Sequence, residues 1–233
     1  MKITWIGQAG FLIESDGNKI LIDPYLSNSI EAVNPDFKRL IPIKEEYLEI
    51  EPDVLICTHD HLDHTDPETL KHILKTEKPI DILASGLAWK HIRTLNFTQH
   101  NNLLFDVGTE ITSHGILFKA VKAVHSDENA IGVIMECEGK KIYITGDTLY
   151  NEEIFKSLGE IDLLFVCMNG FGNNMNIEDA TRFAKKVYAK ETIPMHWGMF
   201  EKATADPHLF IQKLNEKGLK GRILNTYESI EII

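Results

Sequence analysis

The residues best suited to chemistry lie in one short segment, 58–64, whose sequence is Thr-His-Asp-His-Leu-Asp-His. Three imidazoles and two carboxylates fall within six positions, directly after the apolar run 53–57. A strand cannot bury so many hydrated groups unless a cation binds them. Imidazole nitrogens and carboxylate oxygens are ligands for zinc and, less selectively, for manganese and iron. The segment therefore predicts a metal site after a strand, rather than a solvated turn where three of the ten histidines meet by chance.

Three further residues of the same kind follow other short strand-like runs. His125 follows the apolar run 118–124, Asp147 follows the run 141–146, and His196 follows the run 191–195. Loops at strand ends often carry functional residues on a rigid scaffold. Each residue alone is typical of an ordinary polar loop position. Together with the segment 58–64 they form a candidate set of five histidines and two aspartates.

The order of these residues along the chain is His-x-His-x-Asp-His, then His, then Gly-Asp, then His, and it resembles the metallo-β-lactamase superfamily. The segments 3–13 and 20–24 are similar to the opening hairpin of that fold. The segments 169–176 and 193–200 resemble the branch that contains L-ascorbate-6-phosphate lactonase. The resemblance implies an α/β fold, a four-layer αββα sandwich with mixed sheets inside and helices outside.

Hydrophobic periodicity agrees with this architecture, because two sheets packed face to face would bury all the strand-like runs. The strand-like runs are 2–7, 9–14, 18–23, 53–57, 80–84, 103–106, 116–124, 130–137, 140–145, 161–167, 192–195 and 222–232. Three helices have start signals, at Asp66 before Pro67, at Asn176, and at Asp206 before Pro207. The predicted buried stripes of these helices are Leu70, Ile73 and Leu74; Ala180, Phe183, Ala184, Val187 and Tyr188; and Leu209, Phe210 and Leu214.

Length and composition fit one domain that spans residues 1–233, with a hydrophobic content of 43%. No stretch approaches the roughly 20 apolar residues of a membrane span. The first residues have a strand pattern and not that of a signal peptide. Cys57, Cys137 and Cys167 each lie in an apolar run, which is typical of reduced thiols. We therefore expect a cytoplasmic protein with no membrane partner.

The formal net charge is -11, and the sequence has no cluster of lysine or arginine. Affinity for nucleic acid depends on cations that neutralise phosphates, so we expect no nucleic-acid partner. The expected partner is a small-molecule substrate. The lactonase branch also suggests a homo-oligomer.

The superfamily pattern implies two metal positions that share one bridging carboxylate, Asp147. The first position takes His59, His61 and His125, and the second takes Asp63, His64 and His196. One or two divalent ions per chain, zinc or manganese, are expected. Two cations about 3.5–4 Å apart lower the pKa of a shared water, so that hydroxide can attack a carbonyl carbon or a phosphorus. Asp63 orients this nucleophile or carries its proton to the leaving group, so Asp63 and Asp147 are the candidate catalytic residues.

Asp23 follows the run 20–22 and precedes Pro24, and two interpretations remain open. It accepts a ring N–H from a ligand histidine, or it starts a turn. In the asparagine-rich loop 169–176, the resemblance favours hydrogen bonds to a polar substrate, with Asn169 and Asn174 as candidates. A tight loop alone would also explain these asparagines.

Several neighbouring residues have ordinary structural explanations. Trp197 and Phe200 adjoin His196 and either form a wall of the pocket or pack in the core, which is the more common role of aromatic residues at a strand end. We expect no function for His72 and His91, which lie on predicted helix surfaces, or for His100, His114 and His208. The segment 27–52 is the least periodic, and either a lid over the site or a solvated connector fits it.

These features favour a metal-dependent hydrolase of a small polar molecule, with a sugar-acid or sugar-phosphate lactone as the leading substrate. Against the phosphate, no arginine or lysine cluster suited to hold it is visible. A metal-dependent phosphodiesterase is the first alternative. A non-hydrolytic metal-binding or redox protein is the second, although the third motif position, which is acidic in the di-iron members, is His61 here.

Overall fold

Two mixed β-sheets form the centre of the protein, of which the computed structural model describes residues 1–232. The first sheet consists of β1 (Lys2–Gly7), β2 (Gly10–Ser15), β3 (Asn18–Ile22), β4 (Val54–Cys57), β5 (Asp81–Ala84), β6 (Asn101–Leu104) and β13 (Ser229–Glu231). The second consists of β7 (Glu110–Ser113), β8 (Ile116–Lys122), β9 (Ile131–Cys137), β10 (Lys140–Ile144), β11 (Leu163–Cys167) and β12 (Glu191–Met195). Their strand orders are β13-β1-β2-β3-β4-β5-β6 and β12-β11-β10-β9-β8-β7.

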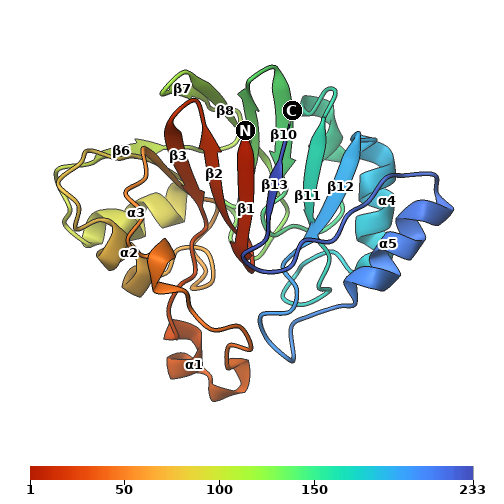
Figure 1. The fold of residues 1–233 in the computed structure, drawn as a ribbon, viewed down its shortest axis with the longest axis horizontal. Helices are drawn as coiled ribbons and strands as arrows, with labels where there is room; N and C mark the ends of the chain where they lie inside the picture. The colour runs from red at the N-terminus through yellow and green to blue at the C-terminus, as the bar shows by residue number, and fades with distance from the viewer. Residues whose placement is uncertain (233) are drawn as a thin grey trace.

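Helices cover the outer faces of both sheets (Figure 1). They are α2 (Pro67–Ile73) and α3 (Gly86–Thr94) on the first sheet, and α4 (Ile177–Val187) and α5 (Pro207–Glu216) on the second. The short helix α1 (Ser29–Val33) lies beyond the strand ends (Figure 1). Three short 3-10 helices complete the set: η1 (Pro35–Phe37), η2 (Glu45–Tyr47) and η3 (Glu152–Ser157). The predicted αββα sandwich is therefore confirmed.

The inner faces of the sheets pack directly against each other. The rings of Phe11 on β2 and Phe165 on β11 lie 4.5 Å apart between their centroids and join the two sheets. Every residue of β4 and of β11 is buried, as expected of strands that are covered on both faces. None of the helices in residues 1–232 combines the length and the apolar character that crossing a bilayer requires.

Parallel pairing brings the functional loops to one edge of the sandwich. Strands β3, β4, β5 and β6 pair in parallel, as do β10, β11 and β12. Strand β8 has the same direction as β10, because both pair antiparallel with β9. Parallel strands end at the same edge of a sheet, so the loops after β3, β4, β8, β10 and β12 emerge close together.

The predicted helix starts are confirmed by their capping hydrogen bonds. Asp66 accepts from the backbone N–H of Glu68 and Thr69, and Asn176 accepts from that of Asp179. Asp206 caps α5 in the same way. At α3, Ser85 occupies the N-cap position but makes no side-chain hydrogen bond to the helix.

Some sequence-based boundaries were wrong for reasons of tertiary structure. The predicted strand 222–232 is reduced to β13, because the chain crosses there from one sheet to the other. Gly221 bridges Thr192 of the second sheet, whereas Ser229 pairs with Thr4 of the first. Strand β7 was not predicted; it is a short edge strand with one buried residue.

Two residues assigned to buried helical stripes are exposed. Tyr188 is 76% exposed, because it occupies the C-cap of α4 in the left-handed conformation and turns away from the stripe. Leu209 is 41% exposed on α5, whereas Phe210 and Leu214 are buried as predicted.

The turn after β10 requires a glycine. Gly146 has a φ of +59°, and a Cβ at this position would lie 2.6 Å from the carbonyl oxygen of Ile131. Both the backbone conformation and this close approach exclude a side chain. The next residue is Asp147, so the packing of Gly146 positions that carboxylate.

We therefore expect Gly146→Ala to lower the free energy of unfolding by about 3 kcal/mol, because it adds a clash to the strained φ. Gly139→Ala is the matched control, since Gly139 has a φ of +69° but a Cβ there would meet no atom within 4 Å. The control is expected to lose about 1 kcal/mol. If urea denaturation shows equal losses of unfolding free energy in the two variants, the close packing at Gly146 is not the cause of its loss.

Candidate metal centre

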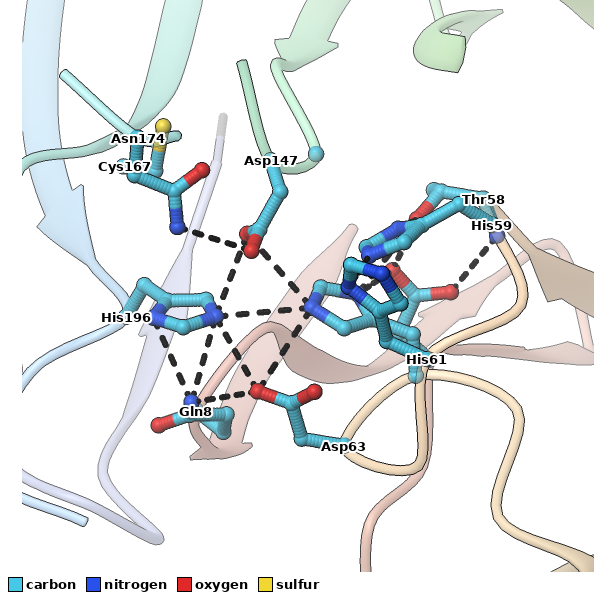
Figure 2. Close-up of polar contacts among 12 residues, drawn as sticks. Gln8, Thr58, His59, His61, Asp63, Asp147, Cys167, Asn174 and His196 are labelled. Atoms are coloured by element: carbon cyan, nitrogen blue, oxygen red, sulfur yellow. Dashed lines mark hydrogen bonds and ion pairs between the residues drawn. The ribbon is translucent and has the colours of Figure 1, made fainter. Parts of the chain in front are cut away.

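The seven side chains of the candidate set converge at the edge where the parallel strands end. Their donor atoms form three overlapping groups, each within 4.8 Å: His59, His61 and His125; His59, His64 and Asp147; and Asp63, His64 and His196. Figure 2 shows Asp147, His196 and Asp63 pointing towards one another from loops that are far apart in the sequence. We call these seven residues the candidate metal centre.

Three imidazoles meet at one side of the centre. His61 Nδ1 lies 3.0 Å from His59 Nε2 and 3.2 Å from His125 Nε2. The ring of His59 is fully buried, and the side chain of His125 is 1% exposed. Three ring nitrogens directed at one point fit a cation that accepts all three lone pairs.

Two imidazoles and two carboxylates meet at the other side. His196 Nε2 lies 3.1 Å from Asp147 Oδ1 and 3.3 Å from Asp63 Oδ2. His64 Nε2 lies 3.4 Å from both His196 Nε2 and Asp147 Oδ1. This set also has the nitrogen and oxygen donors that zinc and manganese accept.

Asp147 lies between the two sides. Its Oδ1 faces His64 and His196, whereas its Oδ2 lies 3.9 Å from His125 Nε2. Oδ1 is buried and accepts no hydrogen bond of good geometry from any described residue. A buried carboxylate oxygen without a donor is costly, and a bound cation would satisfy it. The residues present therefore fit a pair of metal ions.

The outward nitrogens of the histidine rings are also engaged. His64 Nδ1 donates to Asp23 Oδ2 at 2.7 Å, and His125 Nδ1 donates to the carbonyl of Asn173 at 3.2 Å. Thr58 Oγ1 donates to Asp23, so it is left to accept from His59 Nδ1 at 3.1 Å. A proton held at Nδ1 makes Nε2 the ring nitrogen that can bind a cation, and this nitrogen faces the centre.

Asp23 thus lies where the ligand-supporting interpretation places it. It also accepts from the backbone N–H of Thr58 at 2.8 Å, which ties the end of β3 to the ligand loop after β4. Asp23 is fully buried and has a φ of 42°, and His196 has a φ of 63°. Non-glycine residues in this conformation are strained, and such strain is common at functional sites.

Charges within the centre shift the pKa values of its members. Burial would lower the pKa of His196, but Asp147 and Asp63 raise it to about 9. Burial would also lower the pKa of His64, but Asp147, Asp23 and Asp63 raise it well above the usual range. Burial holds the pKa of His59 well below the usual range, and the neighbouring His64 lowers it further.

The pKa values of the two carboxylates, Asp147 and Asp63, are lowered. Burial would raise the pKa of Asp147, but His196 and His64 hold it well below its usual range. The pKa of Asp63 is also lowered, because His64 and His196 outweigh its burial. Both carboxylates are therefore ionised at neutral pH.

Gln8 belongs to the site but was not among the predicted site residues. Its Nε2 donates to Asp63 Oδ2 at 2.7 Å and lies 3.1 Å from His196 Nε2 (Figure 2). The side chain is 1% exposed, and its Oε1 has no hydrogen-bond partner within the described part of the chain. In the sequence, Gln8 is a polar residue within the largely apolar segment 3–13, and this was the available signal. Its partners lie in loops that are distant in the chain.

A cavity of about 400 Å³ opens onto the centre. Its polar lining comprises Gln8, Asn34, His61, Asp63, Ser126, Asp147, Asn169, Asn173, Asn174 and His196. Ile30, Asn34 and Phe37 of the segment 27–52 also line it, which favours the lid over the solvated connector. Phe200 packs in a buried core cluster, as expected, and it also lines the cavity, as the alternative interpretation of this residue proposed.

The two candidate substrate asparagines have different surroundings. Asn174 Nδ2 donates to Asp147 Oδ2 at 2.7 Å, so this side chain positions the carboxylate. Asn169 is 7% exposed and lines the cavity, and neither of its amide atoms has a hydrogen-bond partner in residues 1–232. Asn169 is thus the asparagine with free hydrogen-bonding capacity.

The five histidines without a predicted function lie outside the centre. His91 nevertheless contacts the ligand loop, because its Nδ1 lies 2.6 Å from Asp60 Oδ1. His100 is buried and bonds to the carbonyl of Leu74. Sequence spacing alone did not indicate the pair of Asp60 and His91, since 31 positions separate the two residues.

Comparison with known proteins agrees with this geometry. Residues 2–196 match the family described as "Beta-lactamase superfamily domain". A "UPF0173 metal-dependent hydrolase" of Anoxybacillus flavithermus is 30% identical over 243 residues, which cover 100% of both chains. The chain belongs to the metallo-β-lactamase superfamily. The predicted superfamily is confirmed, and the likeness to the lactonase branch stays a prediction.

Solved structures of the superfamily share the fold. Igni18, described as a novel metallo hydrolase from Ignicoccus hospitalis, has a TM-score of 0.78 at 25% identity, covering 100% of this chain and 99% of its own. CmlA, a diiron beta-hydroxylase from Streptomyces venezuelae, has a TM-score of 0.79 at 16% identity, covering 99% of this chain and 54% of its own. At this level of identity, the likeness to CmlA shows a shared fold alone.

We expect Asp23→Asn to weaken zinc affinity about 10- to 100-fold, because an amide N–H at this position opposes the ring N–H of His64. Asp53→Asn is the matched control, since Asp53 is also buried but lies at the other end of β4 and pairs with Lys78. Competition with a chromophoric chelator measures both affinities. Unchanged affinity in Asp23→Asn would contradict the proposed support of His64.

Metal binding to this superfamily member should release protons at pH 7, because His64 and His196 are protonated in the metal-free protein. Ligation requires their Nε2 lone pairs, so about two protons per chain are expected to leave. The apparent affinity should therefore weaken as the pH falls below about 9. Calorimetry in two buffers of different ionisation enthalpy tests this, and identical heats would contradict it.

Proposed function

We propose that the protein hydrolyses a lactone at the candidate metal centre. The observation that carries the proposal is the convergence of seven nitrogen- and oxygen-bearing side chains, four of which (His61, Asp63, Asp147 and His196) line one cavity. In the step itself, a water oxygen bonds to the carbonyl carbon, the ring C–O bond breaks, and the ring oxygen takes up a proton. The product is a hydroxycarboxylic acid.

Bound divalent ions supply Lewis acidity and lower the pKa of water to near neutrality. The first position would be held by His59, His61 and His125, and the second by Asp63, His64 and His196. Asp147 would contribute to both positions. Asn174 donates a hydrogen bond to Oδ2 of Asp147 and so orients this carboxylate.

The remaining groups position substrate and proton. Asp63 lines the cavity and is ionised, so it can accept a proton from the nucleophile and return it to the leaving oxygen. Gln8 donates to Asp63 Oδ2 and restricts its orientation. Asn169 offers a free N–H and a free carbonyl to the ring substituents of the substrate.

Two observations favour a lactone over a phosphodiester. The described residues that line the cavity include no lysine or arginine to hold a phosphate. They do include the free amide of Asn169, which suits a neutral polar group. Redox chemistry is less favoured, because the relatives that cover the whole chain are named metal-dependent hydrolases.

We expect Asp147→Ala to lower the kcat for δ-valerolactone by at least about 1,000-fold, because the variant loses the shared carboxylate. Asp162→Asn is the control, since Asp162 precedes β11 at the opposite end of the second sheet. Acid release with a pH indicator measures turnover by the zinc-loaded and manganese-loaded proteins. Undiminished turnover in Asp147→Ala would overturn the mechanism, and wild-type protein without turnover of any lactone would overturn the function.

A further inference from the structure

One side of the cavity is apolar, although its floor is polar. The residues on this side come from three loops: Ile30 and Phe37 from the segment 27–52, Phe171 from the loop after β11, and Phe200 and Ala203 from the loop after β12. We call these five residues the apolar wall. A wall assembled from three separate loops is not a by-product of one local sequence pattern.

Aromatic contacts hold the wall together. The ring centroid of Phe37 lies 5.5 Å from that of Phe171 and 5.7 Å from that of Phe200. Phe200 is 2% exposed and packs against Tyr25 behind it, at 6.0 Å. Phe200 therefore forms the base of the wall, and Phe37 connects it to the lip.

Phe171 forms the lip and is 46% exposed. When an apolar ligand covers a phenylalanine ring exposed to this extent at the mouth of a cavity, apolar surface is removed from water, which favours binding. The loop around Phe171 is otherwise polar, with Asn169, Asn173 and Asn174, and the ring contacts Phe37 of the wall. The ring is thus suited to contact a substrate.

The charged groups near the wall do not offer an anion site. Arg39 lies over the Tyr25 ring at 4.7 Å and donates to the backbone carbonyls of Tyr25 and Ile41, so it serves the packing of the segment 27–52. Lys202 pairs with Asp36 at 2.6 Å. The acidic groups that line the cavity are Asp63 and Asp147. A phosphate on the wall side would thus lose hydration without gaining a cationic partner.

We propose that the substrate is a neutral lactone with an alkyl or aryl substituent. The ester group lies at the metal centre, the substituent lies against Phe37, Phe171 and Phe200, and Asn169 bonds the polar part of the ring. This substrate class rests on the proposed hydrolysis of a lactone and replaces the sugar-phosphate lactone expected from the sequence. The cavity of about 400 Å³ accommodates a ring with a short substituent.

A series of six-membered lactones that differ only in the substituent tests the proposal. The series comprises δ-valerolactone, δ-hexalactone, δ-octalactone, glucono-δ-lactone and 6-phosphoglucono-δ-lactone, each measured with the uncatalysed rate subtracted. We expect kcat/KM to rise about fourfold for each methylene that the wall buries. The two sugar lactones are expected to be poorer substrates than δ-hexalactone.

Substitutions in the apolar wall test whether the wall causes this dependence on substituent length. Phe171→Ala and Phe37→Ala, in separate segments, should each lower kcat/KM about tenfold more for δ-octalactone than for δ-valerolactone. Leu209→Ala is the control, because Leu209 is similarly exposed, at 41%, but lies on α5 and does not line the cavity. It is expected to change neither value.

The possible failures are distinguishable. Turnover that does not rise with substituent length, or that is highest for 6-phosphoglucono-δ-lactone, would overturn the substrate class while the lactonase function stands. A length dependence that persists unchanged in both wall variants would overturn the role of the wall. Absence of turnover with every lactone would overturn the proposed function itself.

Discussion

The structure depends on the electrostatic balance of one buried cluster. Five imidazoles and two ionised carboxylates lie together where hydration is largely excluded. Without a cation, the cluster is balanced by protons, which is why the pKa values of His64 and His196 are raised while those of both carboxylates are lowered. A bound metal ion would replace those protons and would satisfy Oδ1 of Asp147, which accepts no hydrogen bond from the described residues.

The architecture serves this cluster. Parallel strands in each sheet end at one edge and bring loops separated by more than 100 residues to the same point. The close approach of Gly146 to Ile131, and the strained backbone at Asp23 and His196, are local costs that the packed sheets sustain. The apolar wall lines the same cavity, on segments outside the strands that pack against one another.

Features determined by residues that are neighbours in the chain could be predicted from the sequence, whereas features that depend on contacts between distant segments could not. The spacing of His59, His61 and His64 on one loop, and the caps of α2, α4 and α5, follow from neighbours in the chain, and both were apparent from the sequence. Gln8, the pair of Asp60 and His91, and the position of Phe200 in the cavity depend on contacts between distant loops. Tyr188 was misplaced because a left-handed C-cap ends the helical stripe one residue early.

The central claim is that the seven side chains bind metal ions, and the most direct test is the metal content of the freshly purified protein. Elemental analysis, with every ion expressed per chain, measures it without any assumption about the substrate. The account predicts about two divalent ions per chain, zinc or manganese, retained through gel filtration. A protein that retains no metal, and takes up none on titration with either ion, would contradict it.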